Sequence, residues 1–468
     1  MAPTVRSFSA DLEPLDLVGR FPERYPGLLE SGAGSAGRFD ILPMANGECL
    51  RLEYRGGSSG PFAGVDGFLA ALDRWWTALR VPATDIEFAL PFTGGWLLYL
   101  GYELAAEIEP RLKLPPPGSE APVALAIRAP AAWIRDRATH RAWLIAEPGA
   151  GTLLDDFEND VRTAGSAAPE VESAEFEITE EEPQKFLVLV RRALDYIAAG
   201  EVYQANLSRG WQARAARRVD PVSIYRRLRA TNPSPFSALL RDGGFTVSSS
   251  SPERLVEIRG STVSTRPIAG TRPRGATPQA DAALIRSLID NEKERAEHVM
   301  LIDLERNDLG RVCVGGSVRV DEYMSVESYA HVHHIVSNVS GRLRTDVSPV
   351  HVIRALFPGG TITGCPKVRC MEIIAELEAV GRGAYTGSIG YLNRDGSCDL
   401  NILIRTLTAR DGRFAFRTGA GIVADSNPAQ ELAETRAKAE GLLRALRMSP
   451  PQHRSPEIYR LQPCRPES

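Results

Sequence analysis

Two pairs of glutamates, each spaced by three residues, are the first side chains in this sequence that could do chemistry. Glu294 and Glu297 stand in NEKERAEHVM, and Glu431 and Glu434 stand in ELAETRAKA. On a helix this spacing places both carboxylates of a pair on one face. Mg²⁺ needs only one or two protein carboxylates and completes its shell with water and substrate oxygens. The pairs therefore predict a magnesium site that accepts an anionic substrate, with surface salt bridges as the alternative.

Helices are expected to present these glutamates, and two helix starts are marked in the sequence. Asn427 can cap a helix whose first position suits Pro428. Lys438 shares the face of the second glutamate pair, and this face borders an apolar stripe, so the charges are expected at the margin of the core. Further upstream, Thr179 and Glu182 resemble a capping box at the start of another helix.

Two glycine-rich turns could receive ligand carboxylates. FPGGTITGCPKVRCMEII leads into a helix with Pro366 near its first position, and RTGAGIVADSNP contains Gly419 and Gly421 just before the second glutamate pair. Helix N-termini attract anions, and glycines let a ligand approach the backbone closely. The first turn is not a nucleotide-binding P-loop, because Cys365 and Pro366 stand where that motif requires Lys and Ser or Thr. A tight turn without a ligand is the alternative.

An arginine and a group of histidines complete the polar candidates. Arg405, at the end of the apolar strand NILIRT, could clamp a carboxylate with two hydrogen bonds, although strand arginines are usually exposed. In YAHVHHIVSNV, strand alternation puts His331 and His333 on one face and His334 on the other. A single general acid or base fits this pattern better than a metal site, and a histidine satisfied in the core is the alternative.

The elements that must position these residues change character along the chain. Residues 1–146 alternate short apolar runs with Gly and Pro, which predicts a β-rich segment. Residues 147–176 are rich in small and acidic residues and are predicted to form an exposed linker. Residues 177–447 mix strands and helices without a strict βαβ rhythm, and residues 448–468 form a Pro-rich, loosely ordered tail. These patterns predict an α+β fold with a large, mostly antiparallel β-sheet core and flanking helices.

The composition is that of an ordinary globular protein and excludes several classes of function. The 55 basic and 59 acidic residues give a net charge of -4, without basic runs, which argues against nucleic-acid binding. The 6 cysteines show no C-x-x-C spacing, which argues against structural zinc. No signal peptide or apolar stretch of about 18 residues is visible, so a cytoplasmic protein without membrane contact is expected.

The chain resembles the chorismate-utilising enzymes in a series of phrases that occur in the same order along the sequence. These phrases are SSSPERL, RPIAGTRPRG, NEKERAEHVMLIDLERNDLGR, HVHHIVSNV, FPGGTITGCPKVRCMEIIAELE, GSIGYL, NILIRT, GAGIVADS and ELAETRAKA. They span about residues 180–446, and the N-terminal phrases RFDI and GYEL fit the same family. The resemblance implies the family's sandwich-like core with flanking helices and a magnesium-dependent reaction on chorismate.

The resemblance also assigns roles to individual residues. Glu297 and Glu434 would bind Mg²⁺ directly, and Glu294 and Glu431 would act on the metal mainly through water. The metal would neutralise and orient the ring carboxylate. Glu253 would be the general acid for loss of the 4-hydroxyl group, which requires a raised pKa.

Further residues would surround the ring of the substrate. His334 would be an acid-base group near the general acid, and Gly270, Thr271 and Thr361 would line the ring. The carboxylates of the substrate would be held by Tyr385, Arg405, Gly419, Ala420, Gly421 and Lys438.

Several phrases resemble the aminodeoxychorismate synthase group within the family, namely RFDI (38–41), VYQANLS (202–208), NPSPFSA (232–238) and GSIGYL (387–392). That activity would yield 4-amino-4-deoxychorismate for para-aminobenzoate and folate biosynthesis. Such synthases often carry a lysine nucleophile in the P-I-x-G-T phrase, whereas Ala269 stands here, as in anthranilate synthases. Anthranilate synthase, which forms anthranilate and pyruvate for tryptophan biosynthesis, is therefore the alternative. A non-catalytic, ligand-binding regulatory homologue is the second alternative.

Two partners follow from the resemblance. The sequence has no cysteine motif like that of an amidotransferase, so ammonia is expected from a separate glutamine amidotransferase subunit. LLES (28–31) and NPSP (232–235) resemble the tryptophan pocket of this family and predict a bound tryptophan. The residues of that predicted pocket are Leu29, Glu30, Ser31, Tyr203, Asn206, Pro233 and Phe236.

Overall fold

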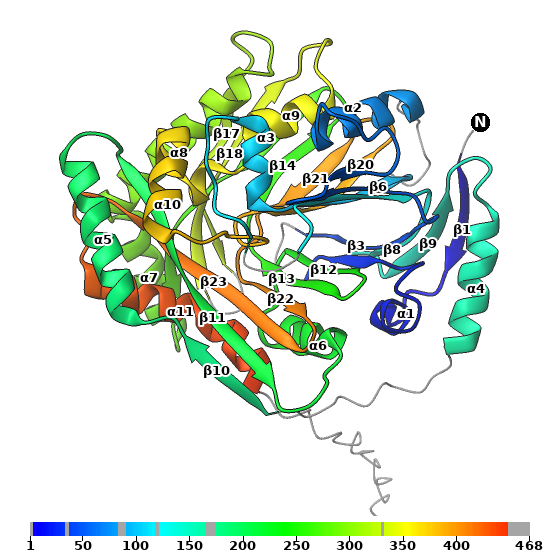
Figure 1. Ribbon diagram of the computed structural model, residues 1–468, viewed down its shortest axis with the longest axis horizontal. Helices are drawn as coiled ribbons and strands as arrows, with labels where there is room; N and C mark the ends of the chain where they lie inside the picture. The colour runs from blue at the N-terminus through cyan, green and yellow to red at the C-terminus, as the bar shows by residue number, and fades with distance from the viewer. Residues whose placement is uncertain are drawn as a thin grey trace, which may run out of the picture.

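Two antiparallel β-sheets, stacked face to face and flanked by helices, make up the molecule (Figure 1). The computed structural model describes residues 3–32, 37–82, 90–117, 121–164, 175–328 and 332–447. Every strand pairing in this part of the chain is antiparallel, since the pairs are joined mainly by turns and helices rather than by βαβ crossovers. The predicted α+β class with a mostly antiparallel core is confirmed.

The first sheet combines strands from both ends of the sequence. Its order is β1 (Thr4–Phe8), β9 (Arg141–Ala146), β8 (Ala131–Asp136), β3 (Phe39–Met44), β2 (Gly27–Glu30), β12 (Phe236–Asp242), β13 (Phe245–Ser251), β22 (Thr406–Arg410), β23 (Arg413–Ile422), β11 (Gln204–Ala215) and β10 (Phe176–Glu180), with β19 (Gly364–Cys365) paired to β11. The pairing of β2 with β12 joins the N-terminal segment to the rest of the chain.

The second sheet is built in the same mixed way. Its order is β16 (Ile268–Pro273), β18 (Val332–Arg342), β15 (Thr262–Arg266), β14 (Arg254–Arg259), β21 (Cys398–Asn401), β20 (Ser388–Asn393), β6 (Gly95–Leu100), β7 (Ala124–Ala129), β4 (Cys49–Glu53) and β5 (Gly57–Ser59), with β17 (Arg319–Ser328) paired to β18. Because β6 pairs with β20, this sheet, like the first, contains strands from both sides of the boundary expected near residue 146.

Helices cover the outer faces and edges of the sheets. They are α1 (Pro14–Arg20), α2 (Phe68–Leu79), α3 (Ala105–Ile108), α4 (Thr152–Ala164), α5 (Pro183–Ala198), α6 (Pro221–Thr231), α7 (Pro278–Ile289), α8 (Glu292–Gly310), α9 (Pro349–Leu356), α10 (Lys367–Glu378) and α11 (Pro428–Arg447), with 3₁₀ turns η1 (Tyr102–Leu104) and η2 (Gly360–Ile362). In Figure 1, α5, α8, α10 and α11 gather at one end of the molecule, and α1 and α4 lie at the other.

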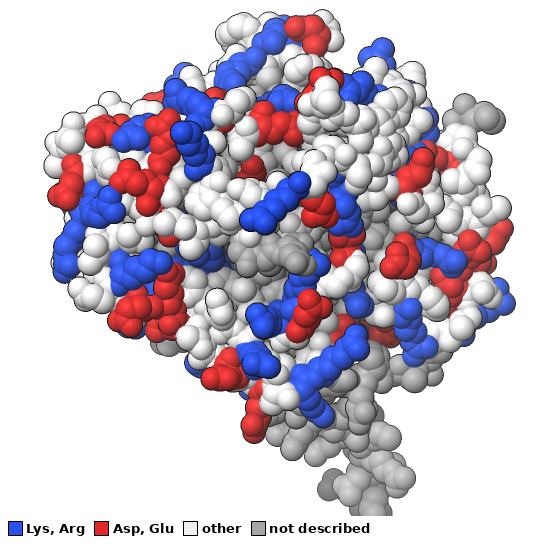
Figure 2. Space-filling model, in the orientation of Figure 1, with Lys and Arg blue, Asp and Glu red and all other residues white. Residues whose placement is uncertain are grey.

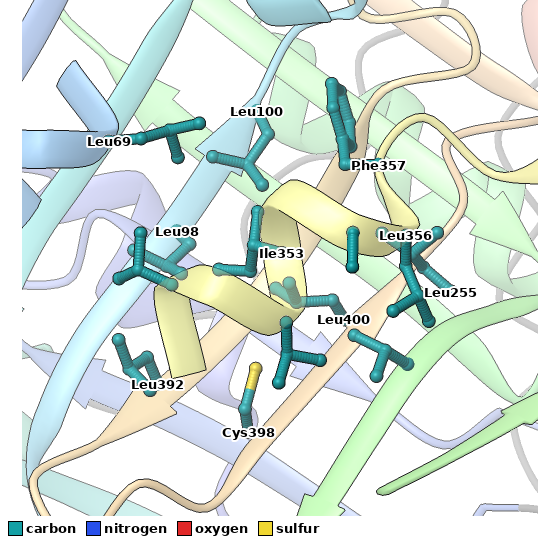
Figure 3. Close-up of a cluster of buried hydrophobic side chains, with 14 of the residues drawn as sticks. Leu69, Leu98, Leu100, Leu255, Ile353, Leu356, Phe357, Leu392, Cys398 and Leu400 are labelled. Atoms are coloured by element: carbon teal, nitrogen blue, oxygen red, sulfur yellow. The ribbon is translucent and has the colours of Figure 1, made fainter. Parts of the chain in front are cut away.

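Strand β6 shows why both faces of the second sheet are buried. Leu97 and Tyr99 point toward the first sheet, where they pack with Leu240 and Phe245. Their neighbours Leu98 and Leu100 point to the opposite face and pack beneath α2 and α9. Figure 3 shows Ile353 of α9 reaching into this outer layer. Alternation along a strand that is covered on both sides turns the run GWLLYL into two separate core layers.

Two local predictions differ from the structure. The linker expected at 147–176 contains helix α4, whose Leu154 and Phe157 are buried, and the ring of Phe157 meets that of Phe8 edge-on at 5.3 Å. This apolar face needs a core to cover it, so residues 152–164 are not an exposed connection. Thr179 does not cap a helix: it lies in β10 opposite Gln212 of β11, and α5 begins at Pro183.

The surface and the described helices agree with the composition. On the face drawn in Figure 2, basic and acidic side chains are interspersed. Among the described residues, no helix is both long enough and apolar enough to span a bilayer. The tail predicted at 448–468 lies outside the described residues.

Candidate active site

The predicted acid Glu253 lies between β13 and β14 and is 5% exposed. The hydroxyl of Thr361 donates a hydrogen bond to Glu253 Oε1 at 2.7 Å. Burial raises the pKa of Glu253 to about 7, although the hydrogen bond from Thr361 and the charges of Lys438 and Arg405 oppose the rise. Glu253 can therefore hold a proton at neutral pH and release it to a leaving group.

A half-buried cation, Arg405, lies close enough to interact with Glu253. Burial lowers the pKa of Arg405, and the negative charge of Glu253 opposes the decrease. Among the described residues, no carboxylate forms an ion pair with the Arg405 guanidinium, in contrast to the buried Arg128, Arg209 and Arg382. A cation that is partly shielded from water and forms no ion pair favours an anionic ligand.

The glycine-rich strand β23 passes between Tyr385 and α11. A Cβ atom on Gly419 would lie 2.6 Å from the Tyr385 hydroxyl, so only glycine lets the strand come this close. Lys438 of α11 donates to the carbonyl of Gly419 at 3.0 Å and pairs with Glu434 at 2.6 Å. Burial raises the pKa of Tyr385 to about 12, so its hydroxyl stays a donor. Tyr385 and Lys438 thus converge on one short stretch of β23.

Alternation along β23 divides its predicted ligand-binding residues. Gly419 and Gly421 share one face, whereas the side chain of Ala420 packs into the apolar cluster beneath α5 and α10. Ala420 therefore offers a ligand its backbone alone.

The histidine pattern is resolved by strand β18. His334 Nδ1 is 2.9 Å from the Thr271 hydroxyl and 3.4 Å from the carbonyl of Gly270. Burial lowers the pKa of His334 to about 4, and the charge of Arg405 adds to the effect, so the ring is neutral at pH 7. His333, on the other face, contacts Asp281 at 2.9 Å and takes no part in the site. His331 lies outside the described residues.

The first predicted metal pair lies on the opening turns of α8. Asn291 caps this helix and accepts from the backbone N–H of Glu294 at 3.1 Å. Glu294 Oε1 accepts from Arg272 at 2.6 Å, while Glu294 Oε2 is buried and has no hydrogen-bond partner among the described residues. Glu297 Oε1 accepts from the side-chain amide of Gln204 at 2.9 Å.

The second predicted pair lies at the start of α11, where Asn427 accepts from the backbone N–H of Ala429 at 3.0 Å as the cap. Glu431 is buried, whereas the side chain of Glu434 is half exposed in its pair with Lys438. The predicted cap and helix start are both found here, since Pro428 opens the helix.

The four glutamates do not meet at one point. Within the described residues, no three His, Cys, Asp or Glu side chains are grouped closely enough to hold a metal ion. Arg272, Gln204 and Lys438 each engage one of the carboxylates. The donor set still fits Mg²⁺ in kind, because it offers carboxylate oxygens and the unpartnered, buried Oε2 of Glu294.

With this geometry established, the chain was compared with known proteins. The family model described as "chorismate binding enzyme" matches residues 47–444. This match covers most of the chain. The chain belongs to the chorismate-binding enzyme family.

Similar members of the chorismate-binding family carry different names. The "Anthranilate synthase component I-like protein" of Synechocystis is 46% identical over 77% of this chain and 74% of its own length. The "Aminodeoxychorismate synthase component 1" of Bacillus subtilis is 43% identical over 81% of this chain and 82% of its own length. The crystal structure of anthranilate synthase component I from Streptococcus pneumoniae matches with a TM-score of 0.77 and 32% identity, over 87% of this chain and 92% of that one.

Sequence reasoning missed Gln204 in this candidate site. The residue is 3% exposed, its Nε2 holds Glu297, and its Oε1 is buried without a partner in the described part of the chain. Asn206, two residues further on the same face of β11, has its Oδ1 beside Gly419, and this atom is also buried without such a partner. The signal available was the alternation in VYQANLS, which places Gln204 and Asn206 on one face and separates them from Tyr203.

The predicted tryptophan pocket is divided by the fold. One group of the predicted residues, Leu29, Glu30 and Ser31, lies beside Pro233 and Phe236. These segments meet because β2 pairs with β12 and the backbone N–H of Gly32 donates to the carbonyl of Ser234. Glu30 is already engaged by the Tyr225 hydroxyl at 2.8 Å and by Arg229 at 3.0 Å. Tyr203 is 71% exposed next to α10, and Asn206 lies in the site described above, so neither belongs to this group. Binding of tryptophan stays a prediction.

Proposed function

We propose that this chain is the chorismate-binding subunit of an aminodeoxychorismate synthase. It would convert chorismate and ammonia to 4-amino-4-deoxychorismate, a precursor of para-aminobenzoate and folate. The observation that supports this most is the closeness of a protonatable, buried Glu253 to a half-buried Arg405 that forms no ion pair with a carboxylate among the described residues. A substrate with an anionic ring and a hydroxyl leaving group needs both residues, because Arg405 can bind the negative charge and Glu253 can protonate the hydroxyl.

Glu253 is the proposed proton donor in this reaction. Because the Thr361 hydroxyl donates to Glu253 Oε1, the acidic proton belongs on Oε2. That proton passes to the 4-hydroxyl group, whose carbon–oxygen bond breaks and which leaves as water. The nitrogen of ammonia forms the new bond to the ring system and gives up one proton to solvent, because the imidazole of His334, whose pKa burial lowers to about 4, is too weak a base to hold it.

The side chains around β23 would bind and orient the ring. Arg405 and Tyr385 supply donors for one carboxylate, and the backbone of Gly419 lets the ligand approach closely. Lys438, held on the carbonyl of Gly419, adds positive charge at the same place. Holding the ring between the proton donor and the attacking ammonia lowers the entropic part of the activation barrier.

Magnesium is proposed as the cofactor, with Glu297 and Glu434 as direct ligands and Glu294 and Glu431 acting through water. When bound, Mg²⁺ would neutralise and polarise the ring carboxylate. The unpartnered Oε2 of Glu294 supports a cation at this place. Gln204 would hold Glu297 in the orientation that binding needs.

Ammonia is proposed to come from a separate glutamine amidotransferase subunit. The names of the relatives support a second subunit, because both the Synechocystis and the Bacillus subtilis proteins are called component 1 or I. Ala269 supports direct attack by ammonia, since it is a buried methyl group on β16 that can form no covalent bond to the ring.

Anthranilate synthase is the second candidate, and Ala269 is the observation that favours it. The family resemblance places a lysine at this position in many aminodeoxychorismate synthases and an alanine in anthranilate synthases. The relatives named for the two activities are also similarly identical, at 46% and 43%.

Identification of the product decides between the two activities. The purified chain is incubated with chorismate, Mg²⁺ and ammonium at pH 8, and the products are separated by chromatography and identified by mass spectrometry. We expect 4-amino-4-deoxychorismate, which retains the enolpyruvyl group, and no release of pyruvate. Anthranilate with an equal amount of pyruvate would replace the first candidate by the second, and unchanged chorismate would refute both.

A further inference from the structure

A second buried acid, Glu305, lies behind Glu253 and has no role in the mechanism above. It belongs to α8 and is 6% exposed. Its Oε1 lies 3.4 Å from the place that a Cβ atom on Gly360 would take. The next residue, Thr361, donates its hydroxyl to Glu253. The 3₁₀ turn η2 therefore contacts both carboxyl groups, and their charges interact.

Neighbours of Glu305 on α8 line a cavity of about 810 Å³ bounded by α3, α8 and α10, although Glu305 itself does not line it. Leu304, Asp308 and Lys367 line this cavity, and Glu305 interacts with the charges of the last two. Lys367 forms a short ion pair with Asp308 and also donates to the carbonyl of Leu356 at 3.1 Å. Polar groups thus extend from the cavity through Glu305 toward Glu253.

The charged surroundings let Glu305 hold a proton near neutral pH. Burial raises the pKa of Glu305 to about 8, and the carboxylates of Asp308 and Glu253 add to this effect, while Lys367 opposes it. These three residues are the charged groups that face Glu305 from its own helix, from the chain after β13 and from α10. The charges that face Glu253 are those of Lys438 on α11 and Arg405 before β22.

We propose that Glu305 returns to Glu253 the proton that Glu253 gives to the departing hydroxyl group, and that the cavity between α8 and α10 supplies it. This role rests on the proposed use of Glu253 as the acid. The proton count is balanced: Glu253 donates one proton to the leaving water, Glu305 passes one to the Glu253 carboxylate, and water in the cavity returns one to Glu305 through the Lys367–Asp308 pair. Ammonia releases one proton to solvent as the carbon–nitrogen bond forms, so no net proton is consumed.

A comparison of the first turnover with steady turnover tests this role. At pH 6, below the pKa of about 7, most Glu253 starts protonated in Glu305→Gln, so rapid-quench measurement should give a first turnover at the wild-type rate. Later turnovers should slow by about tenfold or more, with the KM for chorismate within about twofold of wild type. Glu305→Asp keeps an acid and should restore much of the steady rate. The matched control is Glu376→Gln on the outer face of α10, where an exposed carboxylate pairs with Arg192, and it should behave as wild type.

Three results would overturn the relay. These are a wild-type steady rate in Glu305→Gln, an equal loss in its first and later turnovers, and a slow rate in Glu305→Asp equal to that of Glu305→Gln. The product assay tests the proposed function separately. The ratios of variant to wild-type rates can be measured with any product that has lost the 4-hydroxyl group. If the wild type turns over no chorismate, infrared titration of the protonated carboxyl groups gives the answer. There, Glu305→Gln should remove one titrating carboxyl and change the titration of Glu253, and an unchanged Glu253 titration would contradict the coupling.

Discussion

At the scale of single residues, the site is defined by polar groups that the protein leaves without a partner. Among the described residues the Arg405 guanidinium forms no ion pair and Glu294 Oε2 no hydrogen bond, and burial raises the pKa of Glu253 to about 7. Each of these features costs stability in the free protein and is offset when a ligand supplies the missing charge. The site proposed for a dianion and a cation is therefore marked by the polar groups that it leaves unsatisfied.

Replacing Glu253 with glutamine removes the proposed acid but keeps its shape. We expect kcat to fall by about 10²–10⁴-fold, with a smaller effect on KM, because proton donation acts in the transition state. The free carboxyl has a pKa of about 7, so wild-type kcat/KM should fall as pH rises through 7. Steady-state kinetics from pH 6 to 9 measures both effects. A variant with wild-type kcat would show that another group donates the proton.

Replacing Arg405 with lysine keeps a positive charge and removes the planar pair of donors. We expect the KM for chorismate to rise by about tenfold or more, in line with about 1.5–3 kcal/mol for a hydrogen bond to a charged group. Arg436→Lys is the matched control, because Arg436 pairs with Glu180 at the surface. Equal KM values for wild type and Arg405→Lys, measured by initial rates, would remove Arg405 from the carboxylate clamp.

At the scale of elements, helix starts and strand faces decide which side chains meet. Asn427 fixes the first turn of α11, and the two glycines of β23 give room to the amides of Gln204 and Asn206 on β11. Neither arrangement depends on large apolar contacts, since each uses a local hydrogen bond or the absence of a side chain. The elements therefore set the orientation of the side chains proposed to bind the metal and the substrate carboxylates.

Asn427→Ala tests whether the start of α11 orients Glu431 and Glu434. Loss of the cap should cost about 1 kcal/mol of stability and fray the first turn. The Mg²⁺ concentration needed for half-maximal activity should rise by severalfold. Asp220→Ala removes the cap of α6, where Asp220 accepts from Val222 at 3.1 Å, and should lower stability without changing the Mg²⁺ requirement. An unchanged Mg²⁺ requirement in Asn427→Ala would show that the first turn of α11 does not affect metal binding.

At the scale of the whole molecule, stacking two large sheets buries acids that a smaller protein would leave in water. Glu103 and Glu253 have pKa values raised to about 7, and Glu305 to about 8, in each case mainly by burial. Burial lowers the pKa of His298 and His334 to about 4. The fold therefore carries a pH dependence of its own, independent of any substrate.

The stability of the protein should fall as pH rises from 6.5 to 8. The raised carboxyl pKa values contribute stability that is complete below about 4.5, the usual value, and is lost as pH rises through 7 and 8. The lowered pKa values of His298 and His334 oppose this loss of stability only below about pH 6.5, the usual pKa of histidine. We expect a loss of about 3 kcal/mol over this range, measured by urea unfolding in the presence of a chelator. Glu305→Gln should flatten the dependence, and a stability that stays level or rises would contradict these pKa values.

The sequence by itself determined the local features of this protein. Asn427 and Pro428 mark the start of α11, and alternation and glycine turns indicate an antiparallel α+β fold, because caps, turns and periodicity depend on residues within a few positions of each other. Contacts between segments that are distant in the chain could not be predicted from the sequence. Thr179 joined a strand because β11 was available as a partner, and α4 formed because a core was present to cover Phe157. Only the tertiary structure placed Thr361 and Glu305 beside Glu253, since burial and charge interactions between residues far apart in the chain exist only once the sheets have packed.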